Sequence, residues 1–183
     1  MSAFPSFIVS VWFGLVLSLS AGEPGTVHPS PDGKFYIGWF DHDAGKPFGL
    51  CRSVTLRGTT DAHDYFSFVT TPRDTQTTWN KSSTRCILSD APDNGGPTVW
   101  SLVRDEPTDT WKAVKIDPFA SLYAEFKRTA HGAALYRPSI LKMIWESETV
   151  VLFQTRCNLG EFEIELDVSD PDGQPTSRKL SKK

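Results

Sequence analysis

Residues 162–168 alternate strictly between apolar and acidic side chains. Phe, Ile, Leu and Val take the even-numbered positions, and Glu, Glu and Asp take the odd-numbered ones. Because successive side chains of a β-strand point to opposite faces of a sheet, this pattern predicts a strand with one buried face and one face in water. A chain that contains such a strand must supply further elements to cover the buried face.

Short β-prone segments of the same kind recur through most of the chain. They are rich in β-branched and aromatic residues, and Gly, Pro, Asp and Asn separate them. We predict further strands at residues 35–40, 50–57, 65–71, 85–89, 98–104, 111–116, 140–145 and 149–156. The Gly-containing connection Cys-Asn-Leu-Gly-Glu joins the last two strands and predicts a hairpin. The sequence therefore predicts a mainly β, antiparallel fold.

One segment departs from this pattern and predicts a helix at residues 118–131. Its apolar residues recur with helical spacing at Phe119, Leu122, Tyr123 and Phe126. Asp117 is a typical N-cap residue, Pro118 suits the first helical position, and Gly132 lies just past the expected end. We expect this helix to cover the sheet. A helix inserted to bind a partner is the alternative.

The two ends of the chain differ from its β-rich middle. Residues 7–20 carry no charge, and a run of about 14 residues fits the apolar region of a signal peptide better than a membrane-spanning helix. Small residues follow, so we predict a cleaved signal peptide at 1–22, with an uncleaved anchor as the alternative. A single β-rich domain is expected at 23–168. Residues 169–183 predict a disordered basic tail.

Three cysteines, Cys51, Cys86 and Cys157, lie in the expected mature chain. An oxidising compartment permits one disulfide among them and leaves an odd thiol, and the sequence does not select the pair. The alternative is that all three are buried as small hydrophobic residues.

A polar turn that leads into an apolar strand occurs three times. The copies read SPDGKFYIGWFD from Ser30, NKSSTRCILSD from Asn80 and, more loosely, WESETVVLFQT from Trp145. Their spacing of about 50 and 65 residues is in the range of propeller blades. Such a repeated unit cannot bury both of its faces alone, so the copies would have to stack.

The first copy resembles the Ser-Pro-Asp-Gly signature of TolB-type and related WD-like β-propeller repeats. Ser30, Pro31, Asp32 and Gly33 carry the resemblance, and residues 79–83 are similar to a degenerate version of it. The third copy lacks Pro, Asp and Gly. The resemblance implies a periplasmic or extracellular scaffold for protein or ligand contacts, without catalytic residues.

Three such units are too few to close a ring. A closed propeller needs at least about four blades of about forty residues each. Two architectures therefore remain. The first, which we favour, is a compact antiparallel β-sandwich or partial barrel with one covering helix. The second is an open, blade-like β stack with that helix at one edge.

Composition and motifs narrow the function classes. A net charge of −3 and a pI of 5.8 provide no basic surface for nucleic acid. The chain contains no nucleophile elbow, zinc-protease motif or phosphate loop, so we assign no catalytic residues and expect no cofactor. After signal cleavage no stable membrane span is expected. Oligomerisation stays open.

Two sets of residues are candidate sites. Aromatic side chains can stack on a sugar ring or anchor a protein partner, and we predict this role for Trp39, Trp79, Trp100 and Trp111, with core packing as the alternative. Two acidic loops with His could bind a metal ion or perform acid–base chemistry through Asp41, His42, His63 and Asp64, with solvated turns as the alternative.

These observations favour an exported, non-catalytic binding module with a protein or carbohydrate partner. One alternative is a small exported hydrolase or metal-binding enzyme that uses the Asp and His loops. A second alternative is an inhibitor of another exported protein. The hydrolase hypothesis requires the two loops to converge within hydrogen-bond reach.

Overall fold

The computed structural model describes residues 26–43, 45, 49–61, 63–70, 75–91, 97–129, 138–170 and 174–180. These residues form twelve strands and one helix. The strands are β1 (Thr26–Pro29), β2 (Phe35–Asp43), β3 (Leu50–Gly58), β4 (Asp64–Thr70), β5 (Thr75–Trp79), β6 (Arg85–Asp90), β7 (Thr98–Asp105), β8 (Thr110–Ile116), β9 (Ser139–Trp145), β10 (Val150–Cys157), β11 (Gly160–Asp167) and β12 (Thr176–Lys179). The helix is α1 (Ala120–Thr129).

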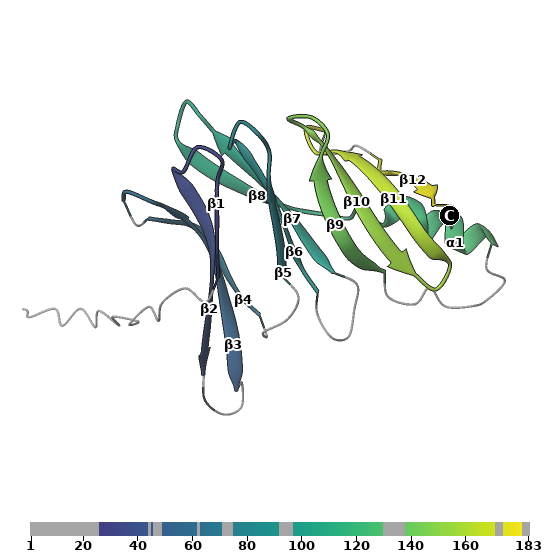
Figure 1. The fold of residues 1–183 in the computed structure, drawn as a ribbon, viewed down its shortest axis with the longest axis horizontal. Helices are drawn as coiled ribbons and strands as arrows, with labels where there is room; N and C mark the ends of the chain where they lie inside the picture. Colours follow the sequence, from purple (N-terminus) through teal and green to yellow (C-terminus); the bar gives the residue numbers. More distant parts are fainter. Residues whose placement is uncertain are drawn as a thin grey trace, which may run out of the picture.

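The strands form three antiparallel sheets of four strands each, and every sheet keeps its strands in chain order. The first sheet is β1–β4, the second β5–β8 and the third β9–β12. Figure 1 shows the three sheets side by side in chain order, with α1 next to β12 at the far end. The prediction of a mainly β fold is confirmed. The arrangement is the open, blade-like stack, which was the second of our two interpretations, rather than a two-layer sandwich.

The second sheet is covered on both faces. On β6, Cys86 and Leu88 pack in a cluster with the first sheet, whereas Ile87 between them packs in a cluster with the third sheet. We call these clusters the first core and the second core. Strand alternation therefore places neighbouring residues of one strand in two different cores.

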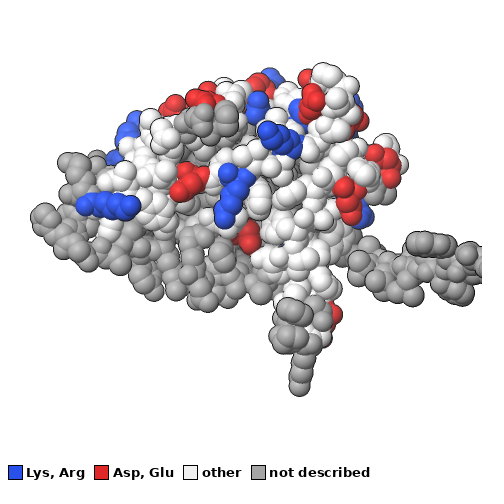
Figure 2. Space-filling model, turned by 180° about the vertical axis from the view of Figure 1, so that it is seen from behind, with Lys and Arg blue, Asp and Glu red and all other residues white. Residues whose placement is uncertain are grey.

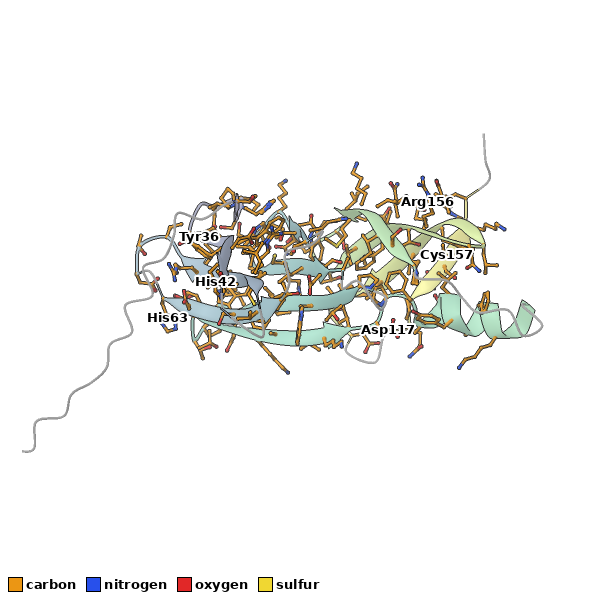
Figure 3. The ribbon with its side chains drawn as sticks, turned by 90° about the horizontal axis from the view of Figure 1, so that it is seen from below. Tyr36, His42, His63, Asp117, Arg156 and Cys157 are labelled. Carbon is orange, nitrogen blue, oxygen red and sulfur yellow. The ribbon has the colours of Figure 1, made fainter. Side chains whose placement is uncertain are left out.

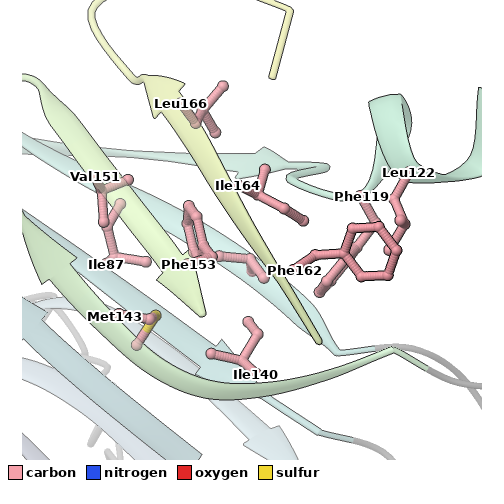
Figure 4. Packing of buried hydrophobic residues seen from close by; sticks show 11 residues of the cluster. Ile87, Phe119, Leu122, Ile140, Met143, Val151, Phe153, Phe162, Ile164 and Leu166 are labelled. Carbon is pink, nitrogen blue, oxygen red and sulfur yellow. The ribbon is translucent and has the colours of Figure 1, made fainter. Parts of the chain in front are cut away.

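The strand from which the sequence analysis began buries its apolar side as predicted. Phe162, Ile164 and Leu166 are 6%, 0% and 5% exposed. They lie in the second core, which Figure 4 shows at close range. A sheet with one solvent-exposed face needs other elements to cover its apolar face. Here the second sheet and α1 cover it.

The predicted helix is present, with Ala120–Thr129 as its bounds. Asp117 caps it, because its Oδ1 accepts a hydrogen bond of 3.0 Å from the backbone N of Phe119. Phe119 and Leu122 are 2% and 0% exposed and join the second core. The helix therefore covers the core at the third sheet. The last two residues of the predicted span, 130–131, lie outside the described residues.

The three repeated turns occupy equivalent places, each between the first two strands of a sheet. Each closes with a backbone hydrogen bond across its base: Ser30 N to Phe35 O (2.9 Å), Asn80 N to Arg85 O (3.1 Å) and Glu146 N to Val150 O (3.0 Å). Gly33 and Ser83 stand at the same position of their turns and both have positive φ, 71° and 62°. The sequence repetition therefore corresponds to a repeated structural unit.

Side chains also link each turn to the next. The backbone N of Asp32 donates to Ser83 Oγ (2.9 Å), which joins the first turn to the second. Asn80 Nδ2 and Ser82 Oγ donate to Glu148 Oε2 (2.7 and 2.5 Å), which joins the second turn to the third. These bonds fix the three sheets to one another at the turn end of the stack.

Three strands were not predicted: β1, β5 and β12. The predicted disordered tail is wrong for β12, which pairs with β11 from Phe162↔Lys179 to Glu165↔Thr176. These short polar segments add to a sheet through backbone hydrogen bonds, which need no apolar alternation. The predicted signal peptide, 1–22, lies outside the described residues. Among the described helical residues, no helix has the length and apolar character to cross a membrane.

The three cysteines are not joined to one another. Cys51 and Cys86 are buried and Cys157 is partly exposed. Complete burial raises the pKa of the Cys86 thiol well above its ordinary value. Cys86 thus behaves as a small core residue, as in the second of our two interpretations of the cysteines.

Candidate functional site

The four predicted binding tryptophans lie between the first and second sheets. Trp39, Trp79, Trp100 and Trp111 are half-buried and pack against the first core. The rings of Trp79 and Trp111 meet edge to face with centroids 5.8 Å apart, and Trp79 Nε1 donates to the backbone O of His28 (3.1 Å). These rings fill the interface between two sheets. A ligand-binding role for them stays a prediction.

The two acidic loops do not converge. Asp41 pairs with Arg52 (2.6 Å) and Asp64 with Arg57 (2.5 Å). The two arginines lie at opposite parts of β3, five residues or about 16 Å apart. Among the described residues, no three His, Cys, Asp or Glu side chains lie close enough together to hold a metal ion. The hydrolase hypothesis gains no support from this arrangement.

The histidines of these loops are also separate. His63 packs edge to face on Tyr65 (4.7 Å), whereas His42 lies on β2 with Nδ1 at 3.5 Å from the backbone O of Phe40. Both are labelled in Figure 3, on the first sheet. The hydrogen bond from Arg52 lowers the pKa of Asp41, which keeps that carboxylate charged and paired.

A cleft of about 350 Å³ lies between the second and third sheets. Its walls come from β6, β7, β8 and the segment that follows β8 on one side, and from the end of β11 and the residues after it on the other. Val114, Ile116 and Leu166 give it an apolar lining. We call it the inter-sheet cleft. Asp117, labelled in Figure 3, lies at its border where β8 ends.

The strand register explains which side chains face the cleft. Val103 pairs with Arg85 on one side and Lys112 on the other, so these three form one row across the second sheet. Ser101 lies in the next row on the same face, between Ile87 and Val114. Trp100, one residue away from Ser101, points to the opposite face and packs against the first core.

Hydrogen-bond donors in the cleft are largely uncommitted. Ser101 is 2% exposed and its Oγ has no partner. The Arg85 side chain makes one hydrogen bond, a long one of 3.4 Å from a terminal guanidinium N to the backbone O of Val168. Within the described part of the chain, the Lys112 side chain has neither a hydrogen bond nor an ion pair, whereas Lys115 lies in the row of Trp100, on the opposite face of the sheet. The cleft therefore offers two cations, Arg85 and Lys112, to a ligand, and the Ser101 hydroxyl is buried in its wall.

The carboxylates of the cleft, by contrast, are engaged within the protein. Asp117 caps α1 through Oδ1. Asp167 Oδ1 accepts hydrogen bonds from the hydroxyl (2.7 Å) and the backbone N (2.9 Å) of Ser169. These two bonds, the hydroxyl first, lower the pKa of Asp167. Asp170 is not free either.

Charges elsewhere are mixed. On the face seen in Figure 2, Lys and Arg are interspersed with Asp and Glu rather than gathered in a stripe. Several of these charges pair within their own hairpin, as Arg104 does with Asp109 and Arg156 with Glu161 (both 2.7 Å). On this face, the described Lys and Arg residues form no continuous basic stripe.

Sequence reasoning missed the inter-sheet cleft. One signal was present: Ser101 interrupts an apolar face that Val99 and Val103 continue on either side. A small polar residue at a buried strand position is unusual without a hydrogen-bond partner. The wall contributed by the third sheet comes from residues more than sixty positions further along the chain, and no local pattern connects the two.

Comparison of the sequence with known protein families and with curated proteins finds no match. The assignment of function therefore depends on the geometry of the site.

Proposed function

We propose that this chain is an exported, non-catalytic binding module whose ligand occupies the inter-sheet cleft. The observation that supports the proposal is the cleft itself, about 350 Å³ with the unpartnered Ser101 hydroxyl in its wall. That volume is at the lower end of the range of about 300–1,000 Å³ typical of small-molecule sites. The apolar segment at residues 7–20 is the basis for export.

Binding fits the lining better than catalysis does. The lining residues include neither His nor Cys. Ser101 has no hydrogen-bond partner in the described structure, so nothing there activates its hydroxyl as a nucleophile. A few polar groups set among apolar side chains are, however, what orients a bound small molecule.

The test is to fill the cleft and ask whether binding is lost. The mature chain from residue 23 is screened by thermal shift against small metabolites, sugars and oligosaccharides, and hits are measured by calorimetry. Val114→Phe places a ring in the cleft, and the control Leu141→Phe adds the same ring at a position that is 44% exposed on β9.

We expect at least one compound to bind the parent chain and the Leu141→Phe control equally, and to bind Val114→Phe at least tenfold more weakly. Circular dichroism checks that both variants keep the β fold. If every compound that binds does so equally well to Val114→Phe, the cleft is not the ligand site and the proposal fails.

A further inference from the structure

We propose that the ligand of the inter-sheet cleft is an organic anion, with a carboxylate or phosphate head group and a short apolar body. This inference rests on the proposed function, because it assigns the chemical class of ligand to the same site. It follows from the contrast between free donors and engaged acceptors in the cleft.

The head group has a defined place. Arg85 and Lys112 flank Val103 in one row across β6, β7 and β8. Adjacent strands are about 4.8 Å apart, so the Cα atoms of the two cations are about 10 Å apart. Both side chains are long enough to converge on an anion above Val103. Beside the hydrogen bonds from Ser169, the positive charge of Arg85 helps to lower the pKa of Asp167. The Arg85 side chain nevertheless forms no ion pair in the described structure, and its single hydrogen bond leaves most of its N–H groups available.

A cationic ligand would find acceptors that are already partly used. The Asp117 carboxylate caps a helix, the Asp167 carboxylate accepts two hydrogen bonds, and Asp170 already has an interaction. A cation would meet carboxylates that already share one oxygen with protein donors, whereas an anion meets guanidinium and ammonium donors that are largely unused. Charge-assisted hydrogen bonds to carboxylate or phosphate are the strongest that Arg and Lys make.

The rest of the lining determines how polar the body of the ligand can be. Val114, Ile116 and Leu166 present apolar surface next to the row of cations. The Ser101 hydroxyl lies buried in the row adjoining Val103, close to the head group. A short alkyl or similar chain satisfies these contacts. A body rich in hydroxyl groups would leave most of them without partners against this surface.

The test compares four probes that share one body. Hexanoate, hexyl phosphate, 1-hexanol and hexylamine are titrated into the mature chain by calorimetry at low ionic strength, with inorganic phosphate as a fifth probe. We expect one or both hexyl anions to bind at least tenfold more tightly than 1-hexanol and hexylamine. The anion that binds more tightly identifies the head group.

Variants locate the anion. Arg85→Gln and Lys112→Gln should each weaken binding of the preferred anion at least fivefold. The matched control Lys142→Gln removes the same charge from an exposed position on β9 and should change nothing. Lys112 is exposed on an edge strand, so its variant should fold even if Arg85→Gln does not.

Three outcomes would overturn the inference: equal binding of 1-hexanol or hexylamine, unchanged affinity in both cation variants, or inorganic phosphate binding as tightly as the hexyl anions. If no anion binds, but a neutral compound binds the parent chain and not Val114→Phe, the proposed class of ligand is wrong and the proposed function stands. If no compound responds to Val114→Phe, both fail.

Discussion

The second sheet packs against a neighbour on each of its faces, but different kinds of side chain fill the two interfaces. Toward the first sheet, the first core includes many aromatic rings: Phe35, Trp39, Tyr65, Phe66, Phe68, Trp79, Trp100 and Trp111. Toward the third sheet, the second core is mostly aliphatic and takes in the helix α1. Trp100 and Ser101 are neighbours on β7, and each faces one of these interfaces.

The difference explains why the inter-sheet cleft lies in the second interface. Stacked, twisted sheets diverge away from their closest strands, and large rings can fill the space that opens. Phe66, Phe68 and Trp100 do so in the first interface, with ring centroids 5.4–6.3 Å apart. In the second interface, the corresponding places on β7 and β8 hold Ser101 and Val114, which leave the inter-sheet cleft open.

The largest effect is expected from emptying the second core. Phe153 is fully buried at 0% exposure, so Phe153→Ala should lower the free energy of unfolding by about 3–5 kcal/mol. Urea denaturation measures the loss. Leu152→Ala is the control, because its side chain points to the opposite face of β10. Equal losses in the two variants would mean that the third sheet does not pack on the second through this face.

A smaller loss is expected from opening the first interface. Trp100 is half-buried, with Phe66 and Phe68 at 5.4 and 6.3 Å, so Trp100→Ala should cost about 2–3 kcal/mol. Tryptophan fluorescence and urea denaturation measure the change. Trp100→Phe should retain most of the stability. If Trp100→Ala is no less stable than the parent chain, the rings do not hold the two sheets together, and their role as a ligand platform becomes the better explanation.

An increase in stability, rather than a loss, is expected from truncating Ser101, the residue next to Trp100. The buried Ser101 hydroxyl lacks a partner, so Ser101→Ala should raise the free energy of unfolding by about 0.5–1.5 kcal/mol. The control is Thr155→Val, since Thr155 is 1% exposed but donates to the backbone O of Phe162 (3.4 Å) and should lose stability. A loss in Ser101→Ala as large as in the control would show that the hydroxyl is already satisfied.

Sequence patterns predicted the strands that carry apolar alternation and the helix that carries two terminal signals. They missed β1 (Thr26–Pro29), β5 (Thr75–Trp79) and β12 (Thr176–Lys179), because these strands are held by backbone bonds to a neighbour. The repeated turns were recognised from sequence, and they mark the second strand of each sheet.

The faces of the sheets were harder to predict than the strands. Alternation separates two sides of a strand, but it does not say which neighbour covers each side. For Trp100 and Trp111 the sequence left both a binding role and core packing open, and the structure places them half-buried between two sheets. The inter-sheet cleft depends on Ser101 and Leu166, which are distant in sequence, and so it required the packing of whole sheets.

The smallest expected effect is a pH dependence of the free energy of unfolding that comes from the first interface and not from the second. His28 packs on Trp39 in the first interface (ring centroids 4.6 Å), and its Nε2 is buried without a partner. Burial lowers the pKa of His28 below the ordinary value of 6.5. The unfolded chain therefore binds a proton at this residue more readily than the folded chain does. The free energy of unfolding should fall as the pH drops through 6.5, and this contribution should level off below the folded-state pKa.

Urea denaturation at pH 7.5 and at pH 5.5 measures this contribution, and His28→Gln should reduce the difference between the two values. The carboxylates whose pKa is lowered, such as Asp41 and Asp167, titrate below this window and do not contribute to it. If the parent chain and His28→Gln lose the same stability on acidification, the first interface is no more sensitive to protonation than the second, which has no buried His in its described core.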